Sequence, residues 1–327
     1  MSDTMSGPQN GPGYDVLVVG GGAAGLSAAL VLARARRRVA VVDAGEPRNA
    51  PAAHMHGFLS RDGMSPAALL EAGRAEAAGY GAELIGGRVD RIDRTGSGFL
   101  AHLAGGPTPG ARRLLVATGL RDELPGLPGV RERWGRDVLH CPYCHGHEVR
   151  DRPVAVLGTG PGSVQQALLV RKWSDDTVFF PHILSLSGDE REWLAARGVR
   201  VVDGAVRRLV VEDDRLRGVE LAGGRVVPRE AVFVLPRAVP HDALLTGLGC
   251  ERDEDGWVVT DASGRTSVPG VWAVGNVADR RAQVITAAGM GSVAAVAIDH
   301  DLVDEEVARA VEEHRATHAT PPSSPVR

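Results

Sequence analysis

The segment CPYCHG at residues 141–146 contains two cysteines with two residues between them, and histidines stand directly before and after the pair. This spacing lets two thiols form a disulfide, and a nearby helix N-terminus lowers the pKa of a thiol. Pro142 suits the first turn of a helix and Gly146 suits its end, so we expect a single helical turn capped by the pair. The flanking His140 and His145 can take up or supply protons near neutral pH. The segment therefore predicts reversible thiol–disulfide chemistry.

Three other interpretations of Cys141 and Cys144 compete with this one. CPYCH also matches the pattern of haem attachment, which takes place outside the cytoplasm, whereas residues 1–13 lack the features of a signal peptide. CxxCHxH could bind zinc, but four ligands within seven residues would crowd a tetrahedral site. A structural disulfide is disfavoured in the cytoplasm, where we expect this chain of three cysteines to reside. Redox catalysis is the interpretation that we adopt, and Cys250 is expected to be a core residue.

Gly20, Gly22 and Gly25 form a complete GxGxxG motif between a predicted strand and a predicted helix. The first glycine permits a tight turn, the second lets the backbone approach a pyrophosphate, and the third lets helix and strand pack closely. The helix N-terminus supplies N–H donors to the phosphates. Asp43 ends the next strand, near the spacing expected for an acid that binds ribose hydroxyls. These residues predict a dinucleotide site.

A second glycine-rich turn, GTGPGS at residues 158–163, has Ser163 in place of the third glycine. Pro161 also removes one backbone donor from the turn. An NADPH site would want arginines beyond the strand that ends at Phe180, to pair with the 2′-phosphate, and none occurs before Arg191. We therefore expect this unit to be kept for its fold and for dimer contacts rather than for NADPH.

Both turns belong to strand–turn–helix–strand units, at residues 14–43 and 153–180, whose strands are nearly continuous runs of aliphatic residues. Such runs indicate buried parallel strands, so the expected fold class is α/β with two doubly wound nucleotide-binding domains. We predict a discontinuous FAD-binding domain at 1–121 and 251–327. A module resembling an NAD(P)H domain, at 122–250, is expected to carry the CxxC.

The remaining segments are expected to connect or flank these domains. The Pro-rich stretch 121–129 predicts a linker, and residues 1–13 and 315–327 predict disordered tails. The arginines at 34 and 36–38 follow a predicted helix and are expected to be solvated. A formal charge of −4 and a pI of about 6.3 argue against a nucleic-acid or acidic membrane partner. No apolar run is long enough to span a bilayer.

The order of these motifs resembles the low-molecular-weight thioredoxin reductases over about residues 14–305. GGGAAG, ATG, CxxC, a second glycine-rich turn and a Gly-Asn pair before QVITAAGMG follow one another as they do in that family. The resemblance implies a two-domain homodimeric flavoprotein with FAD in the split domain and the CxxC in the inserted one. It also implies that Cys144 faces the flavin while Cys141 exchanges with the substrate.

Three departures from that family point to one branch of it. The arginine motif HRRxxxR for NADPH is missing, His145 replaces the acid after the CxxC, and Gly275-Asn276 replaces a Gly-Asp pair. These changes resemble the flavin-dependent dithiol oxidases of the gliotoxin and holomycin type, which close a disulfide in a small natural product and use dioxygen. We therefore expect an FAD-dependent dithiol oxidase. The alternatives are an NADPH-dependent disulfide reductase and a non-catalytic redox-sensing or metal-binding protein.

The expected site thus has two groups of residues and no metal. The predicted catalytic residues are Cys141, Cys144, His140 and His145. The predicted FAD-binding residues are Gly20, Gly22, Ala23, Ala24, Gly25, Asp43, Ala44, Arg48, His56, Val89, Ala117, Thr118, Gly119, Gly275, Asn276, Ala282, Gln283 and Val284. Segment 54–63 is a candidate flavin neighbour because it follows the first strand–turn–helix–strand unit, and it contains His54 as well as His56. The expected partners are a small-molecule dithiol, dioxygen and a second copy of the chain.

Overall fold

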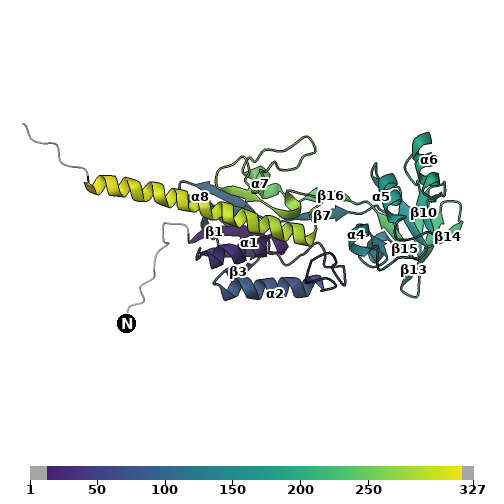
Figure 1. Ribbon diagram of the computed structural model, residues 1–327, viewed down its shortest axis with the longest axis horizontal. Coiled ribbons are helices and arrows are strands. Elements are labelled where there is room, and N and C mark those ends of the chain that lie inside the picture. The colour runs from purple at the N-terminus through teal and green to yellow at the C-terminus, as the bar shows by residue number, and fades with distance from the viewer. Residues whose placement is uncertain (1–12, 319–327) are drawn as a thin grey trace, which may run out of the picture. The chain divides into compact units, whose positions relative to one another are not determined.

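A computed structural model describes residues 13–318, and the chain divides into two compact units (Figure 1). Unit 1 comprises the described residues of Met1–Gly45, Leu70–Gly119 and His241–Arg327. Unit 2 comprises Glu46–Leu69 and Leu120–Pro240. In the part of the chain that is described, no helix is long and apolar enough to cross a membrane.

Unit 1 is built on a seven-stranded sheet in the order β3-β2-β1-β6-β5-β4, with β17 paired to β6. Its strands are β1 (Tyr14–Val19), β2 (Val39–Asp43), β3 (Glu83–Gly86), β4 (Val89–Thr95), β5 (Gly98–Leu103), β6 (Gly110–Val116) and β17 (Val271–Ala273). Its helical elements are α1 (Ala23–Arg34), most of α2 (Pro66–Gly79), α7 (Ala243–Gly247), the 3-10 turn η1 (Gly275–Val277) and α8 (Val284–His318). The central strand β1 is parallel to both β2 and β6.

The two faces of this sheet carry different layers. Helices α1 and α8 lie side by side on one face, where their alanines and aliphatic residues pack against Val16, Val18 and Trp272 (Figure 1). On the other face, Leu17 and Val19 belong to a core shared with β4, β5 and α7. Because both faces of β1 are covered, the strand is apolar at successive positions rather than at alternate ones.

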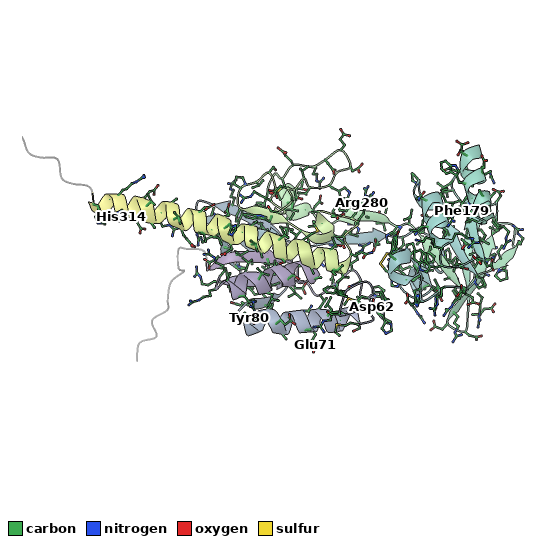
Figure 2. The ribbon with its side chains drawn as sticks, in the orientation of Figure 1. Asp62, Glu71, Tyr80, Phe179, Arg280 and His314 are labelled. Carbon is green, nitrogen blue, oxygen red and sulfur yellow. A yellow bond between two sulfur atoms is a disulfide. The ribbon has the colours of Figure 1, made fainter. Side chains whose placement is uncertain are left out.

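Unit 2 repeats this plan around a five-stranded parallel sheet in the order β11-β10-β9-β15-β8. The strands are β8 (Val138–Leu139), β9 (Val154–Leu157), β10 (Thr177–Phe180), β11 (Arg200–Val201) and β15 (Ala231–Val234). A meander of β12 (Val206–Glu212), β13 (Arg215–Leu221) and β14 (Val226–Pro228) covers one face. Helices α5 (Ser163–Val170) and α6 (Gly188–Ala196) cover the other, where Phe179 is fully buried (Figure 2). The short helices α3 (Val130–Arg133) and α4 (Pro142–His145) complete the unit.

The α/β class with two doubly wound sheets is therefore confirmed, and each predicted glycine-rich turn lies between a strand and a helix. Three details differ from expectation. Residues Leu120–Glu123, at the start of the predicted linker, form β7, which pairs with β16 (Arg237–Pro240), since these segments run antiparallel and satisfy each other's backbone groups. The predicted tail from 315 begins too early, because α8 continues to His318; 1–12 and 319–327 lie outside the described residues.

The arginines after α1 are the third difference, because Arg37 is not solvated. Its guanidinium binds Asp299 and Glu306 of α8 at 2.6 Å each, and only 13% of its side chain is exposed. Arg112 on β6 reaches the same Glu306 at 2.8 Å. These ion pairs join the end of α1 to α8, a pairing across more than 260 residues that the local pattern of charges does not reveal.

The compact units also differ from the predicted domain limits in two segments. Residues 46–69 pack with unit 2, where Pro51 lies so close to Gly135 that a Cβ on the glycine would be 2.8 Å from it. Residues 241–250 pack with unit 1, because Leu245 is buried in the core below β1. The assignment of FAD to one unit and of an NAD(P)H-like role to the other remains a prediction.

Candidate active site

The first glycine-rich turn is shaped by backbone that approaches backbone. Gly20 has φ of +108°, which disfavours other residues, and a Cβ on Gly25 would lie 1.9 Å from the Gly20 carbonyl oxygen. Gly22 is the N-cap of α1 and no side chain caps it, while a Cβ there would meet no atom within 4 Å. The first N–H groups of α1 therefore face open space. This geometry fits the pyrophosphate that the sequence predicts at the turn.

Asp43 stands beside this turn at the end of β2. Its Oδ1 accepts a hydrogen bond from the Gly21 N–H at 3.1 Å, and its Oδ2 pairs with Arg74 at 3.1 Å. The carboxylate is thus oriented by the turn and remains 27% exposed. This geometry fits the predicted contact with a ribose.

Asn276, in η1, shows why an amide replaces the acid of the resembled family. Its Nδ2 donates hydrogen bonds to the carbonyl oxygens of Asp279 at 2.9 Å and Ala282 at 3.0 Å. A carboxylate could not donate either bond. The amide therefore shapes the turn that leads into α8, whereas the sequence alone indicated only that it could still form hydrogen bonds.

The other predicted FAD-binding residues fall in both units. Thr118 and Gly119 follow β6, where the Thr118 hydroxyl donates to the His241 carbonyl and Gly119 accepts from the His241 N–H. Unit 1 also holds Ala23, Ala24, Ala44, Val89, Ala117, Gly275, Ala282, Gln283 and Val284. Arg48 and His56 lie in unit 2, where Arg48 forms a two-point ion pair with Asp122 on β7 at 2.8 Å. Their contact with FAD remains a prediction.

The cysteine pair forms the start of α4. Cys141 and Cys144 are joined by a disulfide with their Cα atoms 5.3 Å apart, and Cys141 is the N-cap of the helix, followed by Pro142 as predicted. The Cys144 N–H donates to Cys141 Sγ at 3.2 Å, which stabilises a thiolate there. A Cβ on Gly146 would lie 2.7 Å from the ring of Trp173, so the end of α4 requires glycine.

The two candidate bases have different surroundings. His140 Nδ1 lies 3.4 Å from the Val234 carbonyl oxygen, and the nearest charges are Asp122 and Arg48. His145 lines a cavity of about 310 Å³ in unit 2 together with His54, His56 and Glu148. Burial is the main cause that lowers the pKa of both candidate bases, so each is neutral near pH 7 and can accept a proton.

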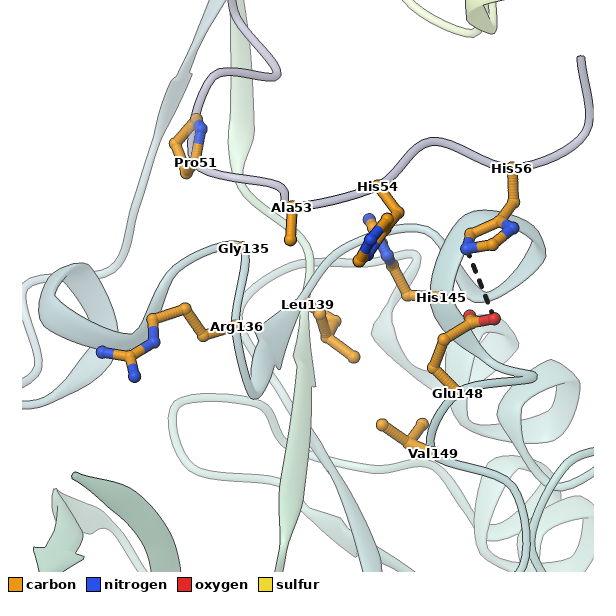
Figure 3. Close-up of a pocket in the computed structure, with 10 residues that line it drawn as sticks. All are labelled: Pro51, Ala53, His54, His56, Gly135, Arg136, Leu139, His145, Glu148 and Val149. Carbon is orange, nitrogen blue, oxygen red and sulfur yellow. Dashed lines mark ion pairs between the residues drawn. The ribbon is translucent and has the colours of Figure 1, made fainter. Parts of the chain in front are cut away.

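This cavity has a polar wall and an apolar one. On the polar side, His56 Nε2 lies 3.4 Å from Glu148 Oε1, and the two side chains face each other in Figure 3. Leu139, Val149 and Pro51 supply apolar surface. The sequence prediction contained His56 as a flavin neighbour and His54 as a candidate, but missed Glu148. Glu148 lies in the turn after α4, which ends at His145, so no helical spacing in the sequence pointed to it.

The second glycine-rich turn is closed by its own side chain. The hydroxyl of the fully buried Ser163 accepts hydrogen bonds from the N–H groups of Thr159 at 3.1 Å and Gly160 at 3.2 Å. Pro161 has no N–H to offer. The donors that would hold a pyrophosphate are therefore already bonded, so this turn does not fit a dinucleotide in the way the first one does.

The segment after β10 is also unsuited to a 2′-phosphate. His182 Nδ1 accepts a hydrogen bond from the Val206 N–H at 3.0 Å, which ties the segment to β12. Leu184 and Leu186 pack against the core of unit 2, and Ile183 is 68% exposed. Apolar residues thus stand where the resembled family has arginines.

No group of three or more His, Cys, Asp or Glu side chains among residues 13–318 is arranged to hold a metal ion. Cys250 is buried, and its Sγ lies 3.5 Å from the Thr266 hydroxyl. Burial raises the pKa of this thiol, which makes it a poor nucleophile.

Comparisons with known proteins agree with this architecture. The model of the pyridine nucleotide-disulphide oxidoreductases matches residues 14–291. The chain is 64% identical to HlmI in a crystal structure, with a TM-score of 0.92 over 95% of this chain and 99% of that one. It is 30% identical to thioredoxin reductase sirT of Leptosphaeria maculans over 90% of this chain and 96% of that protein. It is 31% identical to thioredoxin reductase aclD of Aspergillus oryzae over 91% and 99%.

These matches confirm the predicted thioredoxin reductase-like architecture and the resemblance to its gliotoxin- and holomycin-type members. Proteins of this kind bind FAD, as the open first turn and Asp43 also indicate. The chain belongs to the pyridine nucleotide-disulphide oxidoreductase family and is an oxidoreductase.

Proposed function

We propose that this protein oxidises a small-molecule dithiol to its intramolecular disulfide, with FAD as cofactor and dioxygen as the final electron acceptor. Cys141 and Cys144 would carry the exchange, and His145 would act as the base. We expect the reaction to take place in the cytoplasm. The 64% identity to HlmI, together with the resemblance to dithiol oxidases, supports this assignment.

The occupied second turn is the observation that supports the direction of electron flow most strongly. Because Ser163 already accepts from the Thr159 and Gly160 N–H groups, a nicotinamide dinucleotide would have to displace these bonds before its pyrophosphate could bind. Without a bound NADPH, electrons have to enter through the cysteine pair. A dithiol substrate supplies them there.

Thiol–disulfide exchange gives each residue of the pair a distinct part. A substrate thiolate attacks Cys141 Sγ, the disulfide breaks, and Cys144 leaves as a thiolate. The second substrate thiolate then attacks the substrate sulfur of the mixed disulfide, and Cys141 leaves. The Cys144 N–H, 3.2 Å from Cys141 Sγ, stabilises this leaving thiolate. The first turn and Asp43 would hold FAD, which would supply the two-electron chemistry that links the reduced pair to dioxygen.

The alternative is an NADPH-dependent disulfide reductase, and the names of the relatives sirT and aclD favour it. Anaerobic mixing with NADPH separates the two functions. The oxidase should keep its flavin absorbance for many minutes with NADPH and lose it with a dithiol. Rapid bleaching by NADPH, with no oxygen uptake across a panel of small dithiols, would establish the reductase instead.

Replacing Cys144 by Ser tests the thiol relay directly. The variant should bind FAD as the wild type does, because the first turn lies in unit 1. Oxygen uptake with dithiothreitol should fall at least about a thousandfold, as expected when a nucleophile is removed. A Cys250→Ser variant is the matched control and should retain activity. Full activity of the Cys144 variant would refute the relay.

We also propose a homodimer, in which α8 contributes to the interface. Val293, Val296, Val303 and Val307 recur at helical spacing on this helix and are 42–55% exposed. An exposed apolar stripe of this kind is typical of a surface that another chain covers. Sedimentation equilibrium should give twice the chain mass of 34.3 kDa, and Val303→Glu should weaken the association.

A further inference from the structure

The proposed reaction requires a group in unit 2 that takes the proton from the base His145. If the proposed dithiol oxidation is correct, on which this inference rests, each substrate molecule gives up two thiol protons while the Cys141–Cys144 disulfide is reduced to two thiolates. One imidazole holds only one extra proton. His145 must therefore release the first proton before it can accept the second.

Several titratable and charged groups near His145 could receive this proton or change the pKa of His145. Glu148 is the acid that acts on it, and its charge opposes the effect of burial on the pKa of His145. His56, from segment 46–69, and His140, at the end of β8, act in the opposite direction. The cavity wall also contains His54 and Arg136.

The charge of Arg136 is already compensated, because its Nη1 lies 2.9 Å from Asp214. His140 lies beside a buried carbonyl rather than in the cavity. Neither arrangement offers a carboxylate to His145 on its way to solvent. Glu148 is thus the acceptor that the cavity supplies.

Glu148 is connected onward to solvent. Its Oε1 lies 3.4 Å from His56 Nε2 (Figure 3). The other ring nitrogen of His56 lies 3.3 Å from Asp62 Oδ2. The side chain of Glu148 is 41% exposed and that of Asp62 is 66% exposed. Asp62 is held in place by the Gly57 N–H at 2.8 Å. The chain of groups therefore begins in the cavity and ends in water.

We infer that Glu148, with His56 and Asp62 behind it, relays protons from His145 to solvent between the two thiol exchanges. Glu148 acts through His145 and is a positioning and relay residue rather than a catalytic one.

Protons, bonds and electron pairs balance in each of the two exchanges. In the first, the substrate thiol passes its proton to His145, its sulfur bonds to Cys141, and Cys144 takes the electron pair of the broken S–S bond. The proton moves from His145 to Glu148 and out, which leaves His145 neutral. In the second, the remaining thiol passes its proton to His145, the substrate disulfide forms, and Cys141 takes the electron pair.

A monothiol and a dithiol distinguish the two exchanges, because the second exchange needs another molecule of a monothiol but only the second thiol of the same dithiol. The test compares wild type, Glu148→Gln and the exposed control Glu192→Gln as FAD-loaded proteins without oxygen. Quenched-flow alkylation and mass spectrometry follow the mixed disulfide with 2-mercaptoethanol and the free cysteine pair with dithiothreitol. Glu148→Gln should form the monothiol adduct within about twofold of the wild-type rate and should be reduced by dithiothreitol about tenfold more slowly.

The pH profile supplies a readout that a structural role would not change. Since Glu148 raises the pKa of His145, its removal should move the acid limb of the adduct-forming rate to lower pH. Glu148→Asp should restore part of the dithiol rate. Equal slowing of both exchanges, or an unshifted acid limb, would overturn the relay. A wild type that dithiols do not reduce would instead overturn the proposed function, and the relay with it.

Discussion

The two glycine-rich turns lie in the same structural setting and use their backbone N–H groups in opposite ways. In the first, α1 approaches β1 so closely that a Cβ on Gly25 would lie 1.9 Å from the Gly20 carbonyl oxygen. In the second, the corresponding position accommodates Ser163, whose hydroxyl binds the N–H groups of Thr159 and Gly160. The hydroxyl of Ser163 therefore occupies the N–H groups that would otherwise be available to a ligand.

The comparison shows that two turns in the same strand–turn–helix setting can differ in whether their N–H groups are open to a ligand. Unit 1 leaves the donors of its turn open, whereas unit 2 has the same strand–turn–helix arrangement within a smaller sheet and carries the cysteine pair. The second turn needs no ligand for stability, because the Ser163 hydroxyl accepts from its N–H groups. An open turn gains stability only when its ligand binds.

The largest expected effect comes from moving the serine into the first turn. Gly25→Ser should destabilise the protein by more than about 3 kcal/mol, because the new Cβ clashes with backbone that cannot move aside. Thermal unfolding measures the loss of stability, and the flavin content of the purified protein shows whether the variant still binds FAD. A variant that stays folded and yellow would show that α1 can shift away from β1.

A pair of alanine substitutions at corresponding glycines compares ligand binding in the two turns. A Cβ on Gly22 or on Gly160 would meet no protein atom within 4 Å, so both variants should fold. Gly22→Ala should weaken FAD binding at least about tenfold, since the methyl group faces the pyrophosphate. Gly160→Ala should leave oxygen uptake unchanged. Titration of the apoproteins with FAD, followed by fluorescence, measures the affinity of each variant. Equal affinities of the Gly22→Ala and Gly160→Ala variants for FAD would contradict the difference between the two turns.

Ser163→Ala should reveal what the hydroxyl contributes to unit 2. Two N–H groups lose their acceptor, and the expected loss is about 1–3 kcal/mol in the free energy of unfolding. Dithiol oxidation should persist at temperatures where the variant is folded. Denaturant titration gives the free energy, and a neutral substitution would mean that water replaces the hydroxyl.

Acid should affect the two units in different ranges of pH. In unit 2, burial lowers the pKa of His140 and His145 below the ordinary 6.5. The unfolded chain then binds more protons, so stability of order 1 kcal/mol should be lost as the pH falls below about 6.5.

In unit 1, arginine partners hold the pKa of Glu305 and Glu306 below the ordinary 4.5, against the effect of burial. This contribution is present above pH 4.5 and is lost only as the pH falls through their lowered values. Hydrogen exchange resolved by unit, between pH 7 and 4, should therefore show unit 2 loosening first. Loosening of both units at the same pH would contradict this expectation. The His140→Gln variant should show a smaller difference in pH between the two units.

Much of the molecule could be predicted from local pattern. Continuous aliphatic strands, GxGxxG and CxxC identified both sheets, the open first turn and the α4 turn, because these depend on residues within a few positions of one another. Pro161 and Ser163 indicated a poor second site. The ion pairs between Arg37 and the C-terminal helix α8 had no signal in the local pattern.

The tertiary structure decided which distant groups meet. It placed His145 rather than His140 in the cavity, brought His56 to Glu148, and turned the Ser163 hydroxyl onto its own backbone. It also gave Asn276 two carbonyl partners. By itself, the sequence determined the redox pair and the cofactor turn, because their geometry is local. The contact between His56 and Glu148 joins segments 90 or more residues apart, and only folding brings such segments together.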